Sequence, residues 1–456
     1  MRSTLRAIFS LLLCIALAVS LGACTRTEVY EPNSAVALWE KIDQSMNSLK
    51  SMEMTVATDV TYYSMGYQFS VKGSRYVLSA QDAHYNENET LLTCEELSLE
   101  QKMHTVDAYY DGKMYIAVSN GVYNQKLCSK LTHEEYDEDQ GESLTDEINI
   151  VNCTASEFAK EGEGWKLKFS GYTQKTIDHV LQSLGVTEDM LGTSIVDMEV
   201  NIATDKDYFV RDMRIHFQFP DEEGEGISPD FSVTAQYKAL NSATFDTARL
   251  NTEEFTLVDD VRVLNSVAIA LAQRQNASSG SFKLELSNTQ DIAGKITASK
   301  ETDAVSYGRK NGAYYYQITS QMEGQNFEIL YQNGEQTVTV DGQTHTAEQT
   351  EAEAKTFVDG LIDAANYKSS AITGIEKQAE GVYVLTSDAL DLAEYAQQLQ
   401  GNDMALASGT QQITVTFREG KLVQISGKTM LSGTYQKDAL TVTSESNVVF
   451  EDPQEG

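Results

Sequence analysis

Basic residues are scarce in this sequence. Its 456 residues include 34 Lys and Arg against 68 Asp and Glu, which gives a formal net charge of −34 at pH 7. A surface of this charge repels the phosphates of nucleic acids and the headgroups of anionic lipids. We therefore expect no nucleic acid partner and no general electrostatic attraction to a membrane.

Long apolar runs are also scarce, with one exception at the start of the chain. A run from Ala7 to Leu21 follows the positive residues Arg2 and Arg6. Its 15 residues are too few for a bilayer span, which needs about 20. A positive start followed by a short apolar run is typical of a secretory signal sequence. We predict that residues 1–23 are removed on export.

The signal sequence ends in Leu21, Gly22 and Ala23, directly before Cys24. Small residues before a cysteine resemble a lipobox, which implies that the thiol receives a diacylglyceryl group before cleavage. Two acyl chains anchor a protein stably without a transmembrane helix. We predict a lipid on Cys24, a short linker at 24–33, and a body held at the extracytoplasmic face of the cell membrane. An ordinary signal peptide with a chance cysteine is the alternative.

Cysteines outside this segment are few. Cys14 leaves with the signal sequence and Cys24 carries the lipid, so Cys94, Cys128 and Cys153 remain. Three is an odd number, and therefore at most one disulfide forms. Their spacing matches no zinc-binding pattern, and the sequence does not choose which two would pair.

Catalytic motifs are missing as well. The sequence contains no Gly-Xaa-Ser-Xaa-Gly, His-Glu-Xaa-Xaa-His or Cys-Xaa-Xaa-Cys motif and no phosphate-binding glycine loop. No two of its six histidines have metal-ligand spacing. Asp178 and His179 are neighbours on an expected helix, where adjacent side chains point in different directions. We predict a non-catalytic protein without a cofactor or metal. A hydrolase of envelope polymers that uses carboxylates from distant segments is the alternative.

Two acidic segments could suggest calcium binding. Counting from Asp137 within 133–142, Gly141 falls at the fifth position, whereas an EF-hand loop requires glycine at the sixth. We predict a solvated loop here and at 221–226, the expected tip of a hairpin. His216 alternates with apolar neighbours and is expected to be solvated.

Tyrosine is abundant, with 23 residues, and could form a surface that stacks on sugar rings. Most tyrosines lie in alternating strands, where tyrosine is a good strand former. We therefore predict packing roles for Tyr109, Tyr115, Tyr237 and Tyr314.

The chain repeats its pattern of elements. Ser34 and Asp260 can each cap a helix, and alternating strands follow both helices. Asp-Gly and Asn-Gly pairs, which favour tight hairpins, then recur in the same order. They are Asp111-Gly112 and Asn120-Gly121 in the first half, and Asn333-Gly334 and Asp341-Gly342 in the second.

Later elements also correspond. A helix follows the hairpins, weakly indicated around 144–151 and clearly at 357–365. A strand, another amphipathic helix and long closing strands come next in both halves. We predict a first domain at 34–250 and a second at 258–452.

Most strands alternate cleanly, which indicates antiparallel sheets with one apolar face. The predicted fold class is α+β: two tandem curved sheets, each a half-barrel wrapped around two to three helices. In its lipobox and element order, the chain resembles the LolA/LolB/LppX group of half-barrel lipoproteins. That resemblance implies an apolar ligand in the concave side of each sheet.

We therefore expect a membrane-anchored lipoprotein that carries or binds an apolar or lipid-like ligand. An envelope scaffold that binds another protein, with filled cores and open strand edges, is the alternative. The volume and lining of each concavity distinguish the two.

Overall fold

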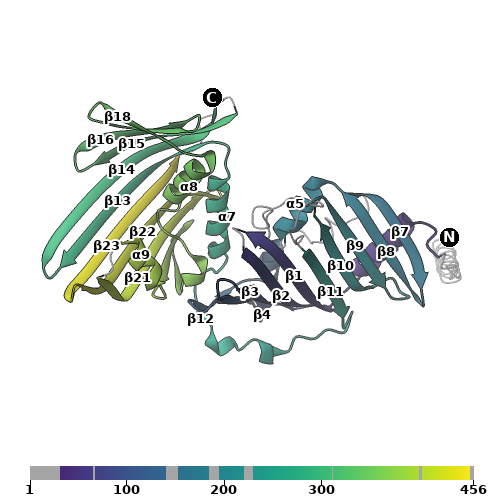
Figure 1. Ribbon diagram of the computed structural model, residues 1–456. Coiled ribbons are helices and arrows are strands. Elements are labelled where there is room, and N and C mark those ends of the chain that lie inside the picture. Colours follow the sequence, from purple (N-terminus) through teal and green to yellow (C-terminus); the bar gives the residue numbers. More distant parts are fainter. Residues whose placement is uncertain are drawn as a thin grey trace, which may run out of the picture.

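The computed structural model describes residues 31–64, 67–139, 152–183, 195–219, 230–310, 312–399 and 403–451. Cys24 and the lipobox residues Leu21, Gly22 and Ala23 lie outside this part, as do the expected helix at 144–151 and the acidic tip at 221–226. The described chain forms two large sheets, of 12 and 11 strands (Figure 1).

The first repeat begins with helix α2 (Ala35–Asn47), where Ser34 accepts a hydrogen bond from the amide of Ala37 at 3.1 Å. The predicted cap is confirmed. Six strands follow: β1 (Met52–Ser64), β2 (Tyr67–Ala80), β3 (Ala83–Cys94), β4 (Leu99–Tyr110), β5 (Lys113–Ser119) and β6 (Asn124–Lys130). The remaining elements are α3 (His133–Asp139), β7 (Cys153–Glu161), β8 (Gly164–Tyr172), α5 (Gln174–Ser183), β9 (Asp197–Thr204), β10 (Val210–Gln218), β11 (Asp230–Lys238) and the short β12 (Thr256–Leu257).

The second repeat begins with α7 (Val263–Gln275). Its six successive strands are β13 (Gly280–Ile292), β14 (Lys295–Lys310), β15 (Ala313–Met322), β16 (Gln325–Gln332), β17 (Glu335–Val340) and β18 (Gln343–Glu348). It continues with α8 (Glu351–Ile362), β19 (Gly374–Ala379), β20 (Val382–Ser387), α9 (Leu392–Gln398), β21 (Met404–Arg418), β22 (Lys421–Tyr435) and β23 (Asp438–Glu451).

The two sheets share one strand order. The first runs β6-β5-β4-β3-β2-β1-β11-β10-β9-β8-β7, with β12 added at the β6 edge, and the second runs β18-β17-β16-β15-β14-β13-β23-β22-β21-β20-β19. Helices also occupy corresponding places, before the first strand, after the sixth and after the eighth of each repeat. The predicted repetition of elements is thus confirmed at the level of topology.

The predicted fold class is wrong. The described chain is mostly β rather than α+β, and its sheets are not half-barrels wrapped around helices. The longest helices, α2 and α7, have 13 residues each, which gives a length of about 20 Å. An 11-stranded sheet is roughly 50 Å wide at about 4.8 Å per strand. The helices therefore cover only part of each sheet.

Three of the four predicted turns have positive φ at both residues. They are Asp111-Gly112, Asn333-Gly334 and Asp341-Gly342, which connect successive strands as expected. At the fourth turn only Gly121 has positive φ, because the loop extends to Tyr123 before β6 begins.

The predicted cap at Asp260 is wrong. Helix α7 begins two residues later than a cap at Asp260 requires, with Arg262 at the cap position. The Asp260 carboxylate instead accepts hydrogen bonds from the backbone amide of Arg262 at 3.1 Å and from its guanidinium Nε at 3.0 Å. The Asp260 carboxylate therefore binds Arg262 and does not cap helix α7.

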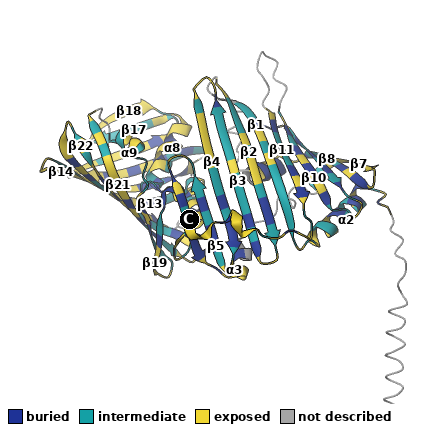
Figure 2. Ribbon diagram, turned by 90° about the horizontal axis from the view of Figure 1, so that it is seen from below, coloured by how far each residue is buried: buried dark blue, intermediate teal, exposed yellow. Residues whose placement is uncertain are grey.

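A connecting segment (239–255) leads from β11 to β12 and crosses the first sheet (Figure 1). Its side chains Phe245, Leu250 and Phe255 pack on the apolar ends of β2 to β6, against residues such as Tyr85 and Tyr115. In β2 and β4 the buried positions lie toward one end of the strand, and β3 has Ala83 and Tyr85 buried at its matching end (Figure 2). The segment thus covers a face that the helices leave bare.

The two repeats share one core at their junction. Tyr109, Met114 and Leu127 of the first repeat pack in the same buried cluster as Val261 and Leu264. The amide of Val258 donates to the carbonyl of Cys128 at 2.8 Å, where β12 runs parallel to β6. The apolar contact and the hydrogen bond both hold the second repeat against the first.

Candidate functional site

The structure places the three remaining cysteines apart. None of Cys94, Cys128 and Cys153 is in a disulfide, and the first two are buried. Burial raises the pKa of the Cys128 and Cys153 thiols above the ordinary value, which disfavours the reactive thiolate. None of the three disulfide pairings left open by the sequence is formed.

The histidine and acidic candidates do not converge. His216 is partly exposed, with Nδ1 3.7 Å from Asp230. The Asp178 carboxylate accepts a hydrogen bond from Gln174 of its own helix at 2.9 Å. In the described part of the chain no group of three His, Cys, Asp or Glu side chains could hold a metal ion.

The acidic segment at 133–142 was predicted as a loop, and this is wrong for its first part. Residues 133–139 form helix α3. Thr132 and Glu135 exchange hydrogen bonds, because the Glu135 carboxylate accepts from the Thr132 amide at 2.9 Å and the Glu135 amide donates to Oγ1 of Thr132 at 3.3 Å. This reciprocal pair satisfies amides that a helix start leaves open.

The predicted packing role of the tyrosines is confirmed. Tyr109, Tyr115, Tyr237 and Tyr314 are all buried in the core. Their rings therefore present no surface for stacking on a sugar.

The strongest site candidate is a row of polar side chains on the inner face of the second sheet. Antiparallel pairing aligns one residue from each of six adjacent strands. We call these residues the polar row: Ser299 (β14), Asn288 (β13), Ser444 (β23), Thr429 (β22), Gln411 (β21) and Ser387 (β20). The row crosses the sheet at a right angle to its strands.

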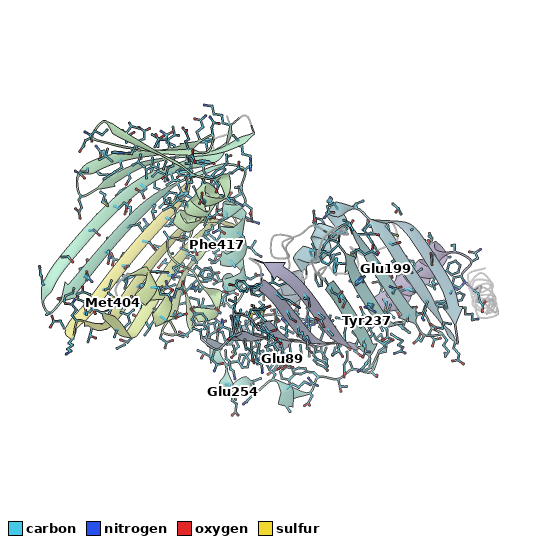
Figure 3. The ribbon with its side chains drawn as sticks, viewed as in Figure 1. Glu89, Glu199, Tyr237, Glu254, Met404 and Phe417 are labelled. Atoms are coloured by element: carbon cyan, nitrogen blue, oxygen red, sulfur yellow. The ribbon has the colours of Figure 1, made fainter. Side chains whose placement is uncertain are left out.

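Apolar clusters lie on both sides of the polar row. Phe417, near one end of β21, packs on the core that contains α7 and α8. Met404, at the other end, packs with residues of α9 and with Leu431 and Leu440. Figure 3 labels Phe417 and Met404 at well-separated places on the second sheet. The polar row, which includes Gln411 of the same strand, separates the two clusters.

A hollow of about 330 Å³ opens over the polar row. Four members of the row, Ser299, Asn288, Ser444 and Thr429, lie on its floor. The other lining residues are Leu286, Ser287, Lys300, Glu301, Met322, Ala364, Ala365, Asn366, Tyr395, Gln398, Leu399, Gly427, Leu431, Glu445 and Ser446. The hollow therefore has a hydroxyl-rich floor and partly apolar walls.

Gln411 fixes the wall above the row. Its side-chain amide donates to the carbonyl of Ala365 at 3.0 Å and to the Tyr395 hydroxyl at 3.3 Å. Asn366 also donates to that hydroxyl, at 3.2 Å. A Cβ added at Gly427 would lie 3.1 Å from the Ala365 Cα, so the glycine allows the chain after α8 to approach the sheet closely.

A carboxylate pair lies at one side of the hollow. Ser320 donates to Glu301 at 3.3 Å, and Asp303 lies two residues beyond Glu301 on β14. Asp303 is 4% exposed, and its Oδ1 has no hydrogen-bond partner among the described residues. Burial raises the pKa of this carboxyl, and the nearby Glu301 carboxylate raises it further.

Sequence reasoning missed this hollow. Inward-facing positions of β13 are apolar at Phe282, Leu284 and Leu286, and the alternation then continues with polar Asn288. The sequence signal for the hollow is that inward-facing residues change from apolar to polar while the alternation of the strand continues. It identifies the position in one strand, but only strand pairing shows that six strands change together.

A second hollow, of about 350 Å³, lies between the first sheet and the connecting segment. Its charged groups bind one another: Glu87 accepts from His104 at 3.0 Å and lies 3.8 Å from Arg249, and Lys126 pairs with Glu254. Burial and the Glu87 carboxylate raise the pKa of Tyr85 to about 12. The Arg249–Glu87 and Lys126–Glu254 pairs attach the segment to the sheet.

None of the described helices has the length and apolar character needed to cross a membrane.

No known sequence family matches this chain, and no curated protein matches it either. A DUF1329 family protein from Desulfovibrio piger is 10% identical, with a TM-score of 0.18, over 43% of this chain and 96% of that one. A protein provisionally described as an outer membrane protein, from Bacteroides fragilis, is 7% identical, with a TM-score of 0.18, over 89% and 98%. Transferrin binding protein B from Haemophilus parasuis is 8% identical, with a TM-score of 0.14, over 89% and 76%. These TM-scores are too low to support conclusions about fold or function.

Proposed function

We propose that this chain is a membrane-anchored, extracytoplasmic and non-catalytic binding protein whose ligand occupies the hollow over the polar row. The polar row itself carries the proposal. Thr429 on the floor is buried, and burial of a polar group costs free energy unless it is hydrogen-bonded. Asn288 and Ser299 are exposed and open to a ligand. A ligand that bonds to these groups accounts for their retention.

The lining supports an amphiphilic, lipid-like ligand. Leu286, Leu399 and Leu431 line the walls and fit an apolar part, while Ser444 and Thr429 on the floor require hydrogen-bonding groups. A plain acyl chain would leave the floor hydroxyls without partners. The ligand therefore combines an apolar part with a polar part.

The anchor in this proposal is the lipid on Cys24, which holds the body near the membrane through the linker at 24–33. Radiolabelled palmitate fed to cells should enter the wild-type protein and remain in the membrane fraction with it. The Cys24→Ala protein should take up no label. Label in both proteins would refute attachment at Cys24.

A non-catalytic role is supported by the chemistry of the lining. Among the described residues that line the hollow, none is histidine or cysteine. The hydroxyls of Ser299, Ser444 and Ser446 therefore have no imidazole beside them in the hollow to act as a general base.

Native mass spectrometry of the Cys24→Ala protein, purified without detergent, tests the proposed site. We expect a bound molecule at a ratio of one to one. Ser299→Trp should abolish it because the indole enters the hollow, whereas Ala298→Trp should retain it because the exposed Ala298 alternates to the other face and does not line the hollow. Both variants first need circular dichroism spectra like that of the parent. Repeated absence of any bound molecule, or equal loss in both variants, would refute the site.

A second function, as an envelope scaffold, is favoured by one specific observation. Strand β18 forms the edge of the second sheet, and all six of its residues are exposed. An exposed edge strand can pair with an extended segment of another protein. Thr346→Pro should abolish recovery of a crosslinked envelope partner if β18 binds it, and should leave the ligand in the hollow unchanged.

A further inference from the structure

The spacing of the polar row limits the chemistry of the ligand. Its members come from adjacent strands, which lie about 4.8 Å apart. Asn288, Ser299, Ser444 and Thr429 therefore present amide and hydroxyl groups at regular intervals across the floor. Hydroxyls both donate and accept, and so the best partner is a ligand whose own groups do the same at a similar spacing.

The charge of the hollow disfavours an anionic ligand. Glu301 and Glu445 line it, with Asp303 buried behind. Lys300, which alternates with Ser299 and Glu301 along β14, is the one cation among the described lining residues. A phosphate or carboxylate headgroup would therefore meet more carboxylates than cations. A hydroxyl, by contrast, can donate to the Glu301 carboxylate.

The polar groups on the floor do not satisfy their hydrogen-bonding capacity with one another. The one contact between two members is long, 3.5 Å from the Ser444 hydroxyl to Asn288 Oδ1. Asn288 and Ser299 are exposed, which leaves that end of the row open to a ligand. At the other end Gln411 already bonds to the Ala365 carbonyl and to Tyr395, and it supports the wall instead.

We infer that the hollow binds an uncharged polyhydroxylated group, such as a sugar ring, laid across β14, β13, β23 and β22. This inference rests on the proposed function and names the polar part of the ligand. The ring hydroxyls bond to Asn288, Ser299, Ser444 and Thr429, and its less polar face lies toward Leu399. A free saccharide and the headgroup of a glycolipid share this chemistry.

Calorimetric titration of the detergent-free Cys24→Ala protein tests the inference with matched probes below their micelle concentrations. The probes are octyl glucoside, pentaethylene glycol monooctyl ether and octyl sulfate, which share one apolar chain, together with maltopentaose, which has none. We expect octyl glucoside to bind about tenfold more tightly than the ether, as the loss of one or two hydrogen bonds implies. Octyl sulfate should bind most weakly of the three octyl probes. Maltopentaose that binds as tightly as octyl glucoside would identify a free saccharide as the source; weaker binding would identify a glycolipid.

A double variant then locates the binding groups. Thr429→Val with Ser444→Ala removes two floor hydroxyls. This double variant should weaken the binding of octyl glucoside about tenfold and leave the binding of the ether unchanged. The control, Ser432→Ala with Thr434→Val, changes exposed residues of β22 and should leave both affinities unchanged.

The outcomes separate the inference from the proposed function. Equal binding of all octyl probes, abolished by Ser299→Trp, would overturn the sugar assignment and keep the binding site. Tightest binding of octyl sulfate would likewise overturn it in favour of an anionic ligand. Absence of binding by every probe overturns the sugar assignment, and absence of a purified ligand as well would overturn both.

Discussion

The two repeats share a strand order but differ on their inner faces. In the first, Phe169, Val200, Ile215 and Val233 of the closing strands are all at most 2% exposed and apolar. In the second, corresponding strands contribute Ser387, Gln411, Thr429 and Ser444 to the polar row. The same strands of the second repeat also carry a buried core, at Leu385, Ile413, Ile425 and Val448, and the polar row lies beside it. One topology therefore supports an apolar row in one repeat and a polar floor in the other. The comparison teaches that the residues on one face, rather than the strand order, decide whether a polar floor forms.

The largest expected effect on stability is in the first repeat. Phe169 is fully buried and contacts Trp39 edge to face, with ring centroids 5.4 Å apart. Phe169→Ala should lower the free energy of unfolding by about 3–5 kcal/mol because it leaves a cavity. Urea denaturation measures this, with the exposed Phe158→Ala as control. Equal costs for the two variants would show that this face is not a packed core.

A smaller effect on stability is expected at Gln411, which supports the wall of the hollow in the second repeat. Gln411→Leu removes the donor to the carbonyl of Ala365 and to the Tyr395 hydroxyl. It should lower the free energy of unfolding by about 1–3 kcal/mol, because the buried carbonyl is left unsatisfied. Gln412→Leu, at the exposed neighbour, should change it little. A stabilised Gln411→Leu protein would mean that the row tolerates apolar filling.

The carboxyl of Asp303 makes the second repeat sensitive to pH. Burial raises its folded-state pKa above the ordinary 3.8, so the folded protein binds this proton more tightly than the unfolded chain does. Its ionisation therefore destabilises the protein as pH rises through the folded pKa, and this cost disappears below pH 3.8. Asp303→Asn should be more stable than wild type at pH 7, with the difference shrinking towards pH 4. Thermal melts across this range measure it, and a constant difference would contradict the assignment.

The smallest effects are expected on the outer faces, where the repeats are alike. Lys168 lies 2.7 Å from Glu199 in the first sheet, and Lys428 lies 2.7 Å from Glu445 in the second. Both pairs are solvent-accessible, so Lys168→Ala and Lys428→Ala should each cost at most about 0.5 kcal/mol. Urea denaturation in low and high salt measures these costs. A cost above that of Gln411→Leu would show that the outer faces also distinguish the repeats.

Local features of the fold were predictable from the sequence. Ser34 caps its helix, and Asp111-Gly112, Asn333-Gly334 and Asp341-Gly342 form the expected turns. These features depend on residues within a few positions of one another, and their preferred φ values or side-chain oxygens act locally. The repetition of elements was predictable for the same reason.

The fold class and the site were not predictable. The α+β half-barrel prediction wrapped each sheet around two to three helices, but it had no measure of sheet width against helix length. Asp260 was misjudged because its carboxylate has a second partner, the guanidinium of Arg262. The hollow was missed because each polar residue of the row looks like an ordinary surface position in its own strand.

The sequence by itself determined the alternation, three of the four turns and the repeat, because each follows from neighbouring residues. The anchor at Cys24 is a prediction of the same local kind. Only the tertiary structure decided that Ser299, Asn288, Ser444 and Thr429 form one floor. They come from four strands whose order along the chain differs from their order in the sheet. Hydrogen bonding between strands sets the register, and the register brings distant polar residues into one row.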